Sequence, residues 1–403
     1  MRLVVSREGS VVPHGSILPG AAGQKQGRYR ACSLSAEYAV NAATLAALRL
    51  PQDLLCVGYR KSTVRNPLVS IVVPVRNRRA TLGRAIDSVL DLQDCAAIEV
   101  VVVDDGSTDG SSALLKEFDD PRISAMRLLH SHGANIARNV GIAVAQAPII
   151  AFLDSDDAYA DGRLSEPLYL LARNPDVGIV ISSFLACKGK RSRELRLRER
   201  VYDGEALVRM IARYILPPST SGLTIRRELL LAGRGFDPKV RRMQDRDLLL
   251  RLAPMTKAAS SSAVSWRKHW HRDGISSQRS SYYDALCAFV ALHPIYRGQE
   301  LATRNYLIAR HVIALFKDGL SSRALEVYRH ARTSLSPRVQ SLPLLLLSYA
   351  ITRFRRRRAM ASVLLDHSEQ PTPVHAAGFE TASSDAPRTA SGRYHTYAGT
   401  VAG

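Results

Sequence analysis

Cysteine is scarce in this sequence. The five cysteines among 403 residues are Cys32, Cys56, Cys95, Cys187 and Cys287. Their number is odd, they are widely separated, and no two of them form a CxxC pair. This distribution argues against a disulfide framework and against a zinc site, and it favours a reducing compartment. We therefore predict a cytoplasmic protein.

Long hydrophobic runs are absent as well. A membrane-spanning helix needs roughly 18 to 20 consecutive apolar residues. The nearest approach is "LPLLLLSYAI" at 342–351, which Pro343 interrupts. The N-terminal residues also lack the sustained apolar region of a secretory signal. The sequence therefore predicts neither a membrane span nor secretion.

Acidic residues are fewer than basic ones, 36 against 56, which gives a formal net charge of +20. Such an excess suggests an anionic partner: nucleic acid, anionic lipid or a phosphorylated substrate. Nucleic-acid-binding modules interleave aromatic and basic residues in recognisable motifs. No such motif is present, so we predict no nucleic-acid partner. The simpler alternative is a solvated surface that is rich in arginine.

Apolar periodicity becomes regular from residue 67. Continuous β-branched runs, typical of strands buried on both faces, lie at 68–75, 98–103, 148–153 and 177–183. Segments with helical apolar spacing lie between them, at 80–92, 111–118 and 134–147. This alternation predicts an α/β fold with a mixed, mostly parallel central sheet.

Composition divides the chain further. Helical patterns dominate after residue 281, and the end of the chain is rich in Ser, Thr, Pro, Ala and Gly with few large apolar residues. We predict an N-terminal extension of unknown role at 1–66, the α/β domain at 67–280, a helical C-terminal region at 281–366 and a disordered tail at 367–403.

Polar residues follow the ends of several predicted strands. In the stretch "IIAFLDSDDAY", 149–159, an apolar run ends in Asp154, Asp156 and Asp157. Carboxylates this close raise one another's pKa unless a cation or hydrogen bonds compensate. In parallel sheets, ligands bind at the carboxyl ends of strands. The acids therefore predict a binding site at this edge of the sheet.

The polar motifs occur in a recognisable order: "VSIVVPVRN", "VVVDDGSTDG", "GANIARNVGI", "AFLDSDD", "GFDPKVRRMQDRDLLLRL" and "HWHRDGISS". Over residues 68–278 this series resembles the family 2 glycosyltransferases, which are inverting enzymes with the GT-A nucleotide-sugar-binding fold. The resemblance implies transfer of a sugar from a nucleotide-diphosphate sugar to a hydroxyl of a saccharide or lipid-linked acceptor. It also implies a role in the biosynthesis of cell-envelope or extracellular polysaccharide or glycolipid.

The resemblance implies a divalent cation. Asp154 and Asp156 match the family's DxD motif, with Asp156 as the expected direct ligand of Mn²⁺ or Mg²⁺, cations that prefer oxygen donors. His271 matches the closing "HxxxxS" loop, where an imidazole can complete the metal shell. A solvated acidic turn and a haloacid-dehalogenase-type nucleophile are the alternatives. The second of these requires a downstream pair of lysines, which is missing.

The resemblance also assigns residues to the nucleotide. These positions are Pro74, Asn77, Asp104, Asp105, Arg138, Asn139 and Asp154. Either Asp104 or Asp105 is expected to read the base, and the sequence leaves open which one. The family usually has an aromatic residue before the motif's Asn, but here Arg76 stands before Asn77.

Inverting transfer requires a general base that takes the proton of the acceptor hydroxyl. "QDRDLLLRL" resembles the family's "EDxDL", which assigns Asp245 as the base. Gln244 replaces the usual Glu, and the loss of a negative neighbour should ease the ionisation of Asp245.

Two other functions stay open at this stage: a sugar-1-phosphate nucleotidyltransferase, and a catalytically silent GT-A scaffold. The basic stretch "RFRRRR" at 353–358 follows the apolar segment at 342–351. Together they predict peripheral contact with an anionic membrane, at the inner face of the cell membrane. The alternative is a buried helix with a solvated basic end.

Overall fold

The computed structural model describes residues 4–5, 11–12, 32–93, 97–270, 281–332 and 340–365. Its strands are β1 Val4–Val5, β2 Val11–Val12, β3 Cys32–Ser33, β4 Leu55–Arg60, β5 Val69–Val75, β6 Ile98–Asp104, β7 Ile123–Leu128, β8 Ile149–Phe152, β9 Ala158–Tyr159, β10 Val177–Lys188, β11 Arg191–Leu195, β12 Arg200–Tyr202, β13 Leu223–Arg226 and β14 Lys257–His269.

The α-helices are α1 Leu34–Tyr38, α2 Ala42–Ala47, α3 Arg79–Leu90, α4 Ser111–Glu117, α5 Ala134–Val144, α6 Ser165–Arg173, α7 Gly204–Ala212, α8 Arg227–Ala232, α9 Gln244–Leu252, α10 Tyr282–Leu292, α11 Leu301–Lys317, α12 Ser321–Arg332 and α13 Leu342–Ala361. Short 3-10 helices lie at η1 Thr220–Gly222, η2 Ala253–Met255 and η4 Pro294–Arg297.

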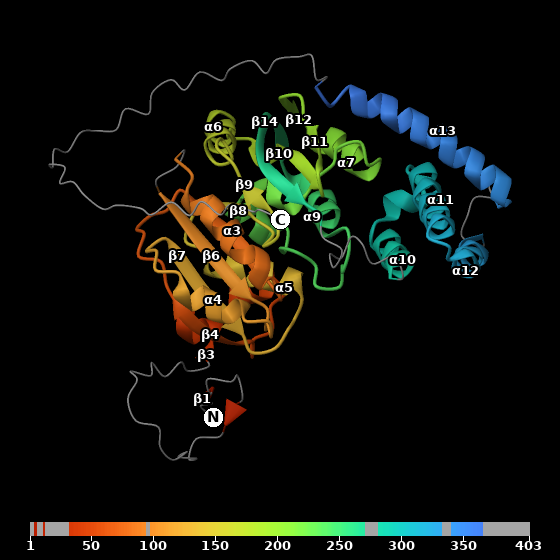
Figure 1. Ribbon diagram of the computed structural model, residues 1–403. Helices are drawn as coiled ribbons and strands as arrows, with labels where there is room; N and C mark the ends of the chain where they lie inside the picture. The colour runs from red at the N-terminus through yellow and green to blue at the C-terminus, as the bar shows by residue number, and fades with distance from the viewer. Residues whose placement is uncertain are drawn as a thin grey trace, which may run out of the picture. The chain divides into compact units, whose positions relative to one another are not determined.

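The central sheet is mixed and has the order β12-β14-β10-β13-β8-β5-β6-β7-β4-β3 (Figure 1). Strands β8, β5, β6 and β7 at its centre are parallel. Strand β13 is antiparallel to both β8 and β10, and β4 is antiparallel to β7. The predicted α/β class, a GT-A-type sheet with a parallel centre and helices at the C-terminal side of the chain, is confirmed. The alternation of strand-like and helical segments in the sequence did not indicate the short antiparallel strand β13.

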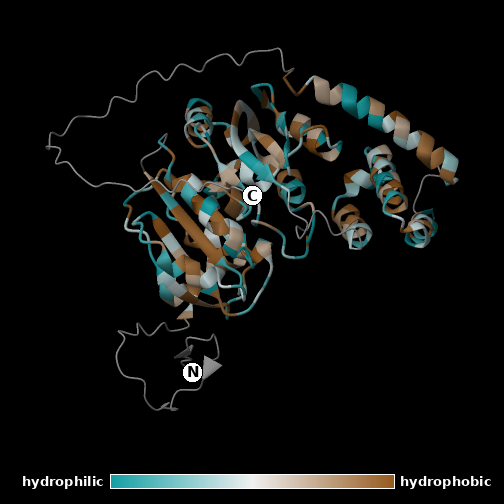
Figure 2. Cartoon of the chain, viewed as in Figure 1, coloured by the Kyte–Doolittle hydropathy of each residue, from teal (hydrophilic) through white to brown (hydrophobic). Residues whose placement is uncertain are grey.

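The core lies on both faces of this sheet. Alternate residues of β5 point to opposite faces: Val72 packs in one apolar cluster with α5, and Ile71 and Val73 pack in another with α3. All three are fully buried, and Figure 2 shows the central strands as apolar along their length. Gly141 lets α5 approach the sheet closely, because a Cβ atom there would lie 2.3 Å from Val72 Cγ1.

Residues 32–60, which the sequence analysis placed in an extension of unknown role, contribute to this sheet and core. Strand β4 pairs with β7, the last of the parallel strands, and β3 pairs with β4 at the edge of the sheet. Leu48, just after α2, is fully buried, and its carbonyl accepts a hydrogen bond of 2.8 Å from Asn139 Nδ2. The segment therefore closes one edge of the α/β domain.

The C-terminal region is helical, as its apolar spacing indicates, with α10 to α13 and η4. Among the described residues, no helix is both long and apolar enough to cross a membrane. The tail predicted to be disordered, 367–403, lies outside the described residues, and so does His271.

Leu48→Ala tests whether the N-terminal segment belongs to the core. Removing a fully buried leucine should lower the free energy of unfolding by about 2–5 kcal/mol, measured by urea denaturation. The matched change Leu68→Ala, at a side chain 55% exposed, should cost within about 0.5 kcal/mol. Equal stabilities of the two variants would show that residues 32–60 are not part of the cooperative core.

Candidate active site

Three polar loops meet where the parallel strands end. Strand β5 pairs in register with β6, with Val75 opposite Asp104, and with β8, with Val72 opposite Phe152. The loops that follow these strands therefore lie at one edge of the sheet. The first two loops are also bonded to each other, because Asn77 Oδ1 accepts a hydrogen bond of 2.8 Å from the Thr108 amide. Pro74 lies inside β5, one residue before its end.

The loop after β5 also depends on the loop after β6 for its helix cap. The N-cap residue of α3 makes no side-chain cap of its own. Instead Asp109 Oδ2 accepts from the Arg79 amide at 3.0 Å, and Ser111 Oγ accepts from the Arg78 amide at 3.0 Å. These side chains satisfy amides that a helix start leaves unpaired. Asp109 of "DGSTDG" and the following Ser111 thus link the two loops at the start of α3.

Asp104 and Asp105 are both buried and hydrogen-bonded within the protein. Asp104 Oδ1 accepts from the Ser107 amide at 2.9 Å, so this carboxylate fixes the turn that leads to α4. Asp105 accepts from the Ser131 hydroxyl at 2.7 Å and from the amides of His132 and Gly133 at 2.6 and 2.9 Å. Which of the two reads a base stays a prediction. Asp105 is the one that fixes the loop leading to α5.

Arg76 occupies the position where the resemblance expects an aromatic side chain. Its guanidinium donates to the carbonyl of Asp105 at 2.7 Å and lies 3.9 Å from the carboxylate of the same residue. About half of the Arg76 side chain is exposed, 48%. A planar guanidinium at this position offers a stacking surface and donors in place of an aromatic ring.

Arg138 joins two motifs that are far apart in the sequence. Its Nη2 donates to Asp154 Oδ1 at 2.7 Å, and its Nη1 donates to Gln244 Oε1 at 2.9 Å. The Arg138 side chain is 6% exposed and also lies over the ring of Phe236, at 5.2 Å. One guanidinium therefore holds the DxD-like loop against the start of helix α9.

The neighbouring Asn139 has a different environment. Its Nδ2 donates to the carbonyls of Leu48 and Phe236, both at 2.8 Å, and its Oδ1 accepts from the Phe236 amide at 2.8 Å. The side chain is fully buried. These bonds use its amide group within the core. Asn139 therefore positions the 235–236 turn, and its predicted contact with the nucleotide stays a prediction.

The three acids after β8 lie in different surroundings. Asp154 pairs with Arg138, whereas Asp156 Oδ2 lies 3.7 Å from Arg78 Nε with its side chain 23% exposed. Asp157 is buried; it accepts from the Ser221 hydroxyl at 2.6 Å and from the His269 amide at 3.0 Å.

The pKa of Asp157 is raised by its surroundings. Burial, and then the negative charges of Asp154 and Asp156, raise its pKa to about 7, against the opposing effects of Lys268 and the hydrogen bond from Ser221. Protein cations near the acids therefore compensate part of their charge but not all of it.

Asp245 lies in the first turn of α9 and is partly exposed. Its Oδ1 accepts from the amide of the next residue, Arg246, at 2.8 Å. The residue before the helix, Met243, has a φ of 59°, a left-handed conformation that is strained for a side chain of this size. Tyr214 donates a hydrogen bond of 3.0 Å to the Met243 sulfur. The conformation of Met243 therefore sets the direction of α9 and the position of Asp245.

Comparison with known proteins finds similarity to one family. The sequence profile of glycosyl transferase family 2 matches residues 70–231. This part of the chain is similar to that family. The match contains the loops after β5, β6 and β8, and it ends before the α9 segment that carries Asp245.

Named relatives align with about a quarter of the chain. The succinoglycan biosynthesis protein ExoU of Rhizobium meliloti is 39% identical over 102 residues, which is 25% of this chain and 29% of ExoU. The putative teichuronic acid biosynthesis glycosyltransferase TuaG of Bacillus subtilis is 39% identical over 104 residues, 25% of this chain and 41% of TuaG. WfgD of Escherichia coli, a UDP-Glc:α-D-GlcNAc-diphosphoundecaprenol β-1,3-glucosyltransferase, is 37% identical over 107 residues, 27% of this chain and 42% of WfgD. The alignments thus span less than half of each relative.

Solved structures with a similar overall arrangement are more distant in sequence. S. aureus TarS 1–349 in complex with UDP has 18% identity and a TM-score of 0.48, over 73% of this chain and 90% of that one. The mannosyltransferase PcManGT of Pyrobaculum calidifontis, in complex with GDP-Man and Mn²⁺, has 19% identity and a TM-score of 0.42, over 79% and 84%.

Asp247 connects helix α9 to the helical C-terminal region. Its Oδ1 is hydrogen-bonded to His293 Nε2 at 3.0 Å, and its Oδ2 accepts from Arg251 Nη2 at 2.8 Å. Burial opposes ionisation, but the bonds from His293 and Arg251 lower the pKa of Asp247 overall. Arg251 also donates to the carbonyl of Gly235 at 2.7 Å. The bonds of Asp247 and Arg251 thus hold helix α9, which carries Asp245, in addition to the bond from Arg138 to Gln244.

Several residues that organise the site were not indicated by the sequence. Ser221 donates to Asp157 and accepts from the Asp154 amide at 3.0 Å, so one hydroxyl spans the acidic loop. Arg163 is fully buried and donates to the carbonyls of Ser221 and Leu223. Ser221 and Arg163 belong to no sequence motif. Their roles follow from their burial and hydrogen bonds in the structure.

The acidic loop can be tested for its fit to a divalent cation. Among the described residues, no group of three His, Cys, Asp or Glu side chains is arranged to hold a metal. The donors present are nonetheless suitable, because Asp156 offers a partly exposed carboxylate next to two other acids. Burial raises the pKa of Asp157 most, and the negative charge of Asp154 raises it further. His271, the third predicted ligand, lies outside the described residues.

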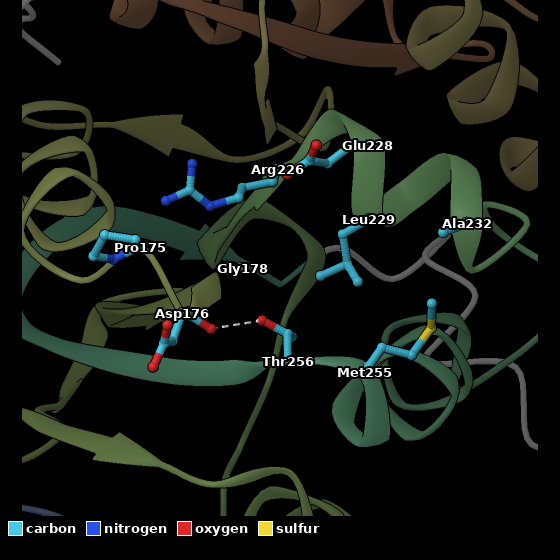
Figure 3. A pocket seen from close by; sticks show the side chains of 9 residues that line it. All are labelled: Pro175, Asp176, Gly178, Arg226, Glu228, Leu229, Ala232, Met255 and Thr256. Atoms are coloured by element: carbon cyan, nitrogen blue, oxygen red, sulfur yellow. Dashed lines mark hydrogen bonds between the residues drawn. The ribbon is translucent and has the colours of Figure 1, made fainter.

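A pocket of about 460 Å³ lies away from this site. Its lining comes from the start of β10, the end of β13, helix α8 and the residues just before β14, and includes Gly178, Arg226 and Thr256 (Figure 3). The hydroxyl of Thr256 donates to the carbonyl of Asp176 at 3.0 Å. Arg226 pairs with Ile149, at the beginning of β8. This pocket is therefore at the opposite end of the strands from the acids.

Asp157→Asn tests the electrostatics of the acidic loop. The folded-state pKa of about 7 exceeds the unfolded value of about 3.9, so the native state binds the extra proton between these pH values. The group's contribution to stability is therefore lost as pH rises through that window, by up to roughly 1.4 kcal/mol per pH unit. In the Asn variant this loss should be absent.

Urea unfolding of both proteins at pH 5 and pH 7.5 measures this difference. A matched substitution at the exposed Asp53, Asp53→Asn, controls for the removal of a carboxylate. Parallel pH profiles for the wild-type protein and Asp157→Asn would contradict the assignment.

Proposed function

We propose that this protein is an inverting glycosyltransferase that transfers a sugar from a nucleotide-diphosphate sugar to a hydroxyl acceptor. The observation that carries the proposal is the pair of hydrogen bonds from Arg138 to Asp154 and Gln244. Through them the loop that would face the donor's diphosphate lies next to the helix turn that bears Asp245. Donor binding and deprotonation of the acceptor require groups in this relation.

The residues of the chain have separate roles in this proposal. Asn77 and Asp105 shape the loops where the nucleoside would lie, and Arg76 offers its guanidinium to the base. Asp245 accepts the proton of the attacking hydroxyl while that oxygen bonds to the anomeric carbon and the bond to the nucleoside diphosphate breaks. Because attack comes from the face opposite the leaving group, the anomeric configuration inverts.

Asp156, with Asp154, would hold Mn²⁺ or Mg²⁺. The cation would supply positive charge for the diphosphate of the donor and of the leaving group. Arg78, close to Asp156, adds a fixed positive charge at the same place. Arg138 keeps Asp154 oriented, and its Nε has no hydrogen-bond partner among the described residues.

The acceptor is proposed from the relatives. ExoU and TuaG are named for polysaccharide biosynthesis, and WfgD for a diphosphoundecaprenol-linked sugar. We propose a saccharide or lipid-linked acceptor in cell-envelope or extracellular polysaccharide or glycolipid biosynthesis. The predicted location, cytoplasmic at the inner face of the cell membrane, is part of the same proposal.

Asp245→Asn tests the catalytic base. The amide cannot accept the proton, so the rate of nucleoside diphosphate release from the donor sugar should fall by at least about 100-fold. Stabilisation of the protein by the bound nucleoside diphosphate should stay unchanged.

The control is Glu205→Gln, at an exposed acid in the first turn of α7, which should keep wild-type turnover. Unchanged turnover in Asp245→Asn would remove this residue from the mechanism. Release of pyrophosphate from a nucleoside triphosphate and a sugar 1-phosphate would instead identify a nucleotidyltransferase.

A thermal-shift screen of UDP, GDP and dTDP, each with and without Mn²⁺ or Mg²⁺, tests the donor site. One nucleotide should stabilise the protein in a metal-dependent way, by about 2.7 kcal/mol at 100 times its Kd. Asp156→Asn should lose the metal-dependent part, and Asp53→Asn should retain it. If no nucleotide binds the wild-type protein under any of these conditions, the scaffold alternative holds.

A further inference from the structure

Helix α13 contacts the rest of the described protein through one side. Leu345 is fully buried, and the ring of Tyr349 stacks on that of Tyr306 with centroids 5.2 Å apart. Arg356 donates to the Tyr306 hydroxyl at 2.9 Å and to the Tyr214 carbonyl at 2.6 Å. These inner residues recur at intervals of three or four, or multiples of them, as expected for one face of a helix.

The opposite side of α13 is also apolar, and it is exposed. Leu344, Leu347, Ile351 and Phe354 recur every three or four residues and are 46, 56, 45 and 69% exposed. Surface leucines scattered singly need no explanation, but a continuous stripe of large apolar side chains marks an interaction site. We call these four residues the outer stripe.

The charge along α13 is of one sign. Arg353, Arg355, Arg357 and Arg358 are exposed in its C-terminal half, and residues 340–365 contain no Asp or Glu. Figure 2 shows apolar residues toward the start of α13 and hydrophilic ones among the later turns. The outer stripe therefore continues directly into a cluster of arginines.

We propose that the outer stripe of α13 docks on an anionic phospholipid bilayer. The four apolar side chains would enter the boundary between headgroups and acyl chains, and the arginines would contact lipid phosphates. The inner side stays bonded to the protein, so the helix lies along the surface. A bilayer matches both parts of this face, since it presents apolar chains and negative charge together.

A second copy of this chain is a poorer occupant. Pairing two outer stripes would bring two arginine clusters together, or place each cluster on apolar residues, with no acid on either helix to compensate. An anionic bilayer avoids this cost. The proposal does not depend on sugar transfer, because it uses none of the residues assigned to the donor or acceptor.

Helix α13 is linked through Tyr214 to helix α9, which carries Asp245. The carbonyl of Tyr214 is bonded to Arg356, and the guanidinium of Arg246, next to Asp245, lies 3.5 Å from the centroid of the Tyr214 ring. A membrane-bound α13 would therefore remain in direct contact with a residue that supports α9.

The test is sedimentation of the full-length protein with phosphatidylcholine vesicles, with and without phosphatidylglycerol, in the absence of any nucleotide. We expect binding to the vesicles that contain phosphatidylglycerol and weaker binding at high salt. Leu347→Gln with Phe354→Gln should reduce the partition coefficient at least about tenfold. Arg355→Gln with Arg358→Gln should reduce it about 25-fold, since each arginine near an anionic surface contributes roughly a factor of five.

Matched controls separate the stripe from general composition. Leu68→Gln changes a leucine that is 55% exposed, almost the same as Leu347. Arg65→Gln with Arg173→Gln removes the same charge from other exposed positions. Both controls should bind vesicles like the wild-type protein, and circular dichroism should show that every variant is folded.

Three results would overturn the proposal. The first is a wild-type protein that does not bind phosphatidylglycerol vesicles. The second is an equal loss of binding in the α13 variants and their controls, which would indicate non-specific attraction by net charge. The third is a Leu347→Gln, Phe354→Gln variant that binds vesicles normally but changes from dimer to monomer in light scattering, which would assign the stripe to self-association.

Discussion

The arrangement of the site depends on the guanidinium of Arg138. It is the side chain that hydrogen-bonds both to the DxD-like loop after β8 and to the first residue of α9, two segments about ninety residues apart in sequence. The Arg138 side chain is 6% exposed, so removing its partner Asp154 would leave a buried charge unpaired, at a cost of about 3–5 kcal/mol. Gln244 suits this position: a neutral oxygen accepts from Arg138 without competing with Asp154 for its charge.

The acidic loop is held together against its own repulsion. Three carboxylates lie within four residues, and each is near a basic side chain: Asp154 near Arg138, Asp156 near Arg78, and Asp157 close enough to Lys268 for its charge to act. Asp157 nevertheless retains a pKa of about 7. The proposed cation and donor diphosphate would add positive and negative charge to this loop, so its electrostatics are central to the proposal.

Helix α9 is supported from several directions. Tyr214 contacts both the left-handed Met243 and the guanidinium of Arg246, and Asp247 connects the helix to His293 of the C-terminal region. The helical region after residue 281 is therefore part of the framework around Asp245. The N-terminal segment has a comparable role on another side, since the carbonyl of Leu48 is bonded to Asn139.

The sequence by itself determined the class of the fold, the parallel central strands and the cluster of polar loops at their ends, because these follow from local periodicity and from turn residues next to each strand. It also indicated the family, through the order of its motifs. The antiparallel strand β13, the place of residues 32–60 in the sheet and the positioning role of Asn139 were decided only by the tertiary structure. So were the contributions of Ser221 and Arg163, and the exposure of the outer stripe. Each of these depends on which distant segments pack together, and a pattern read over a few neighbouring residues contains no information about such contacts.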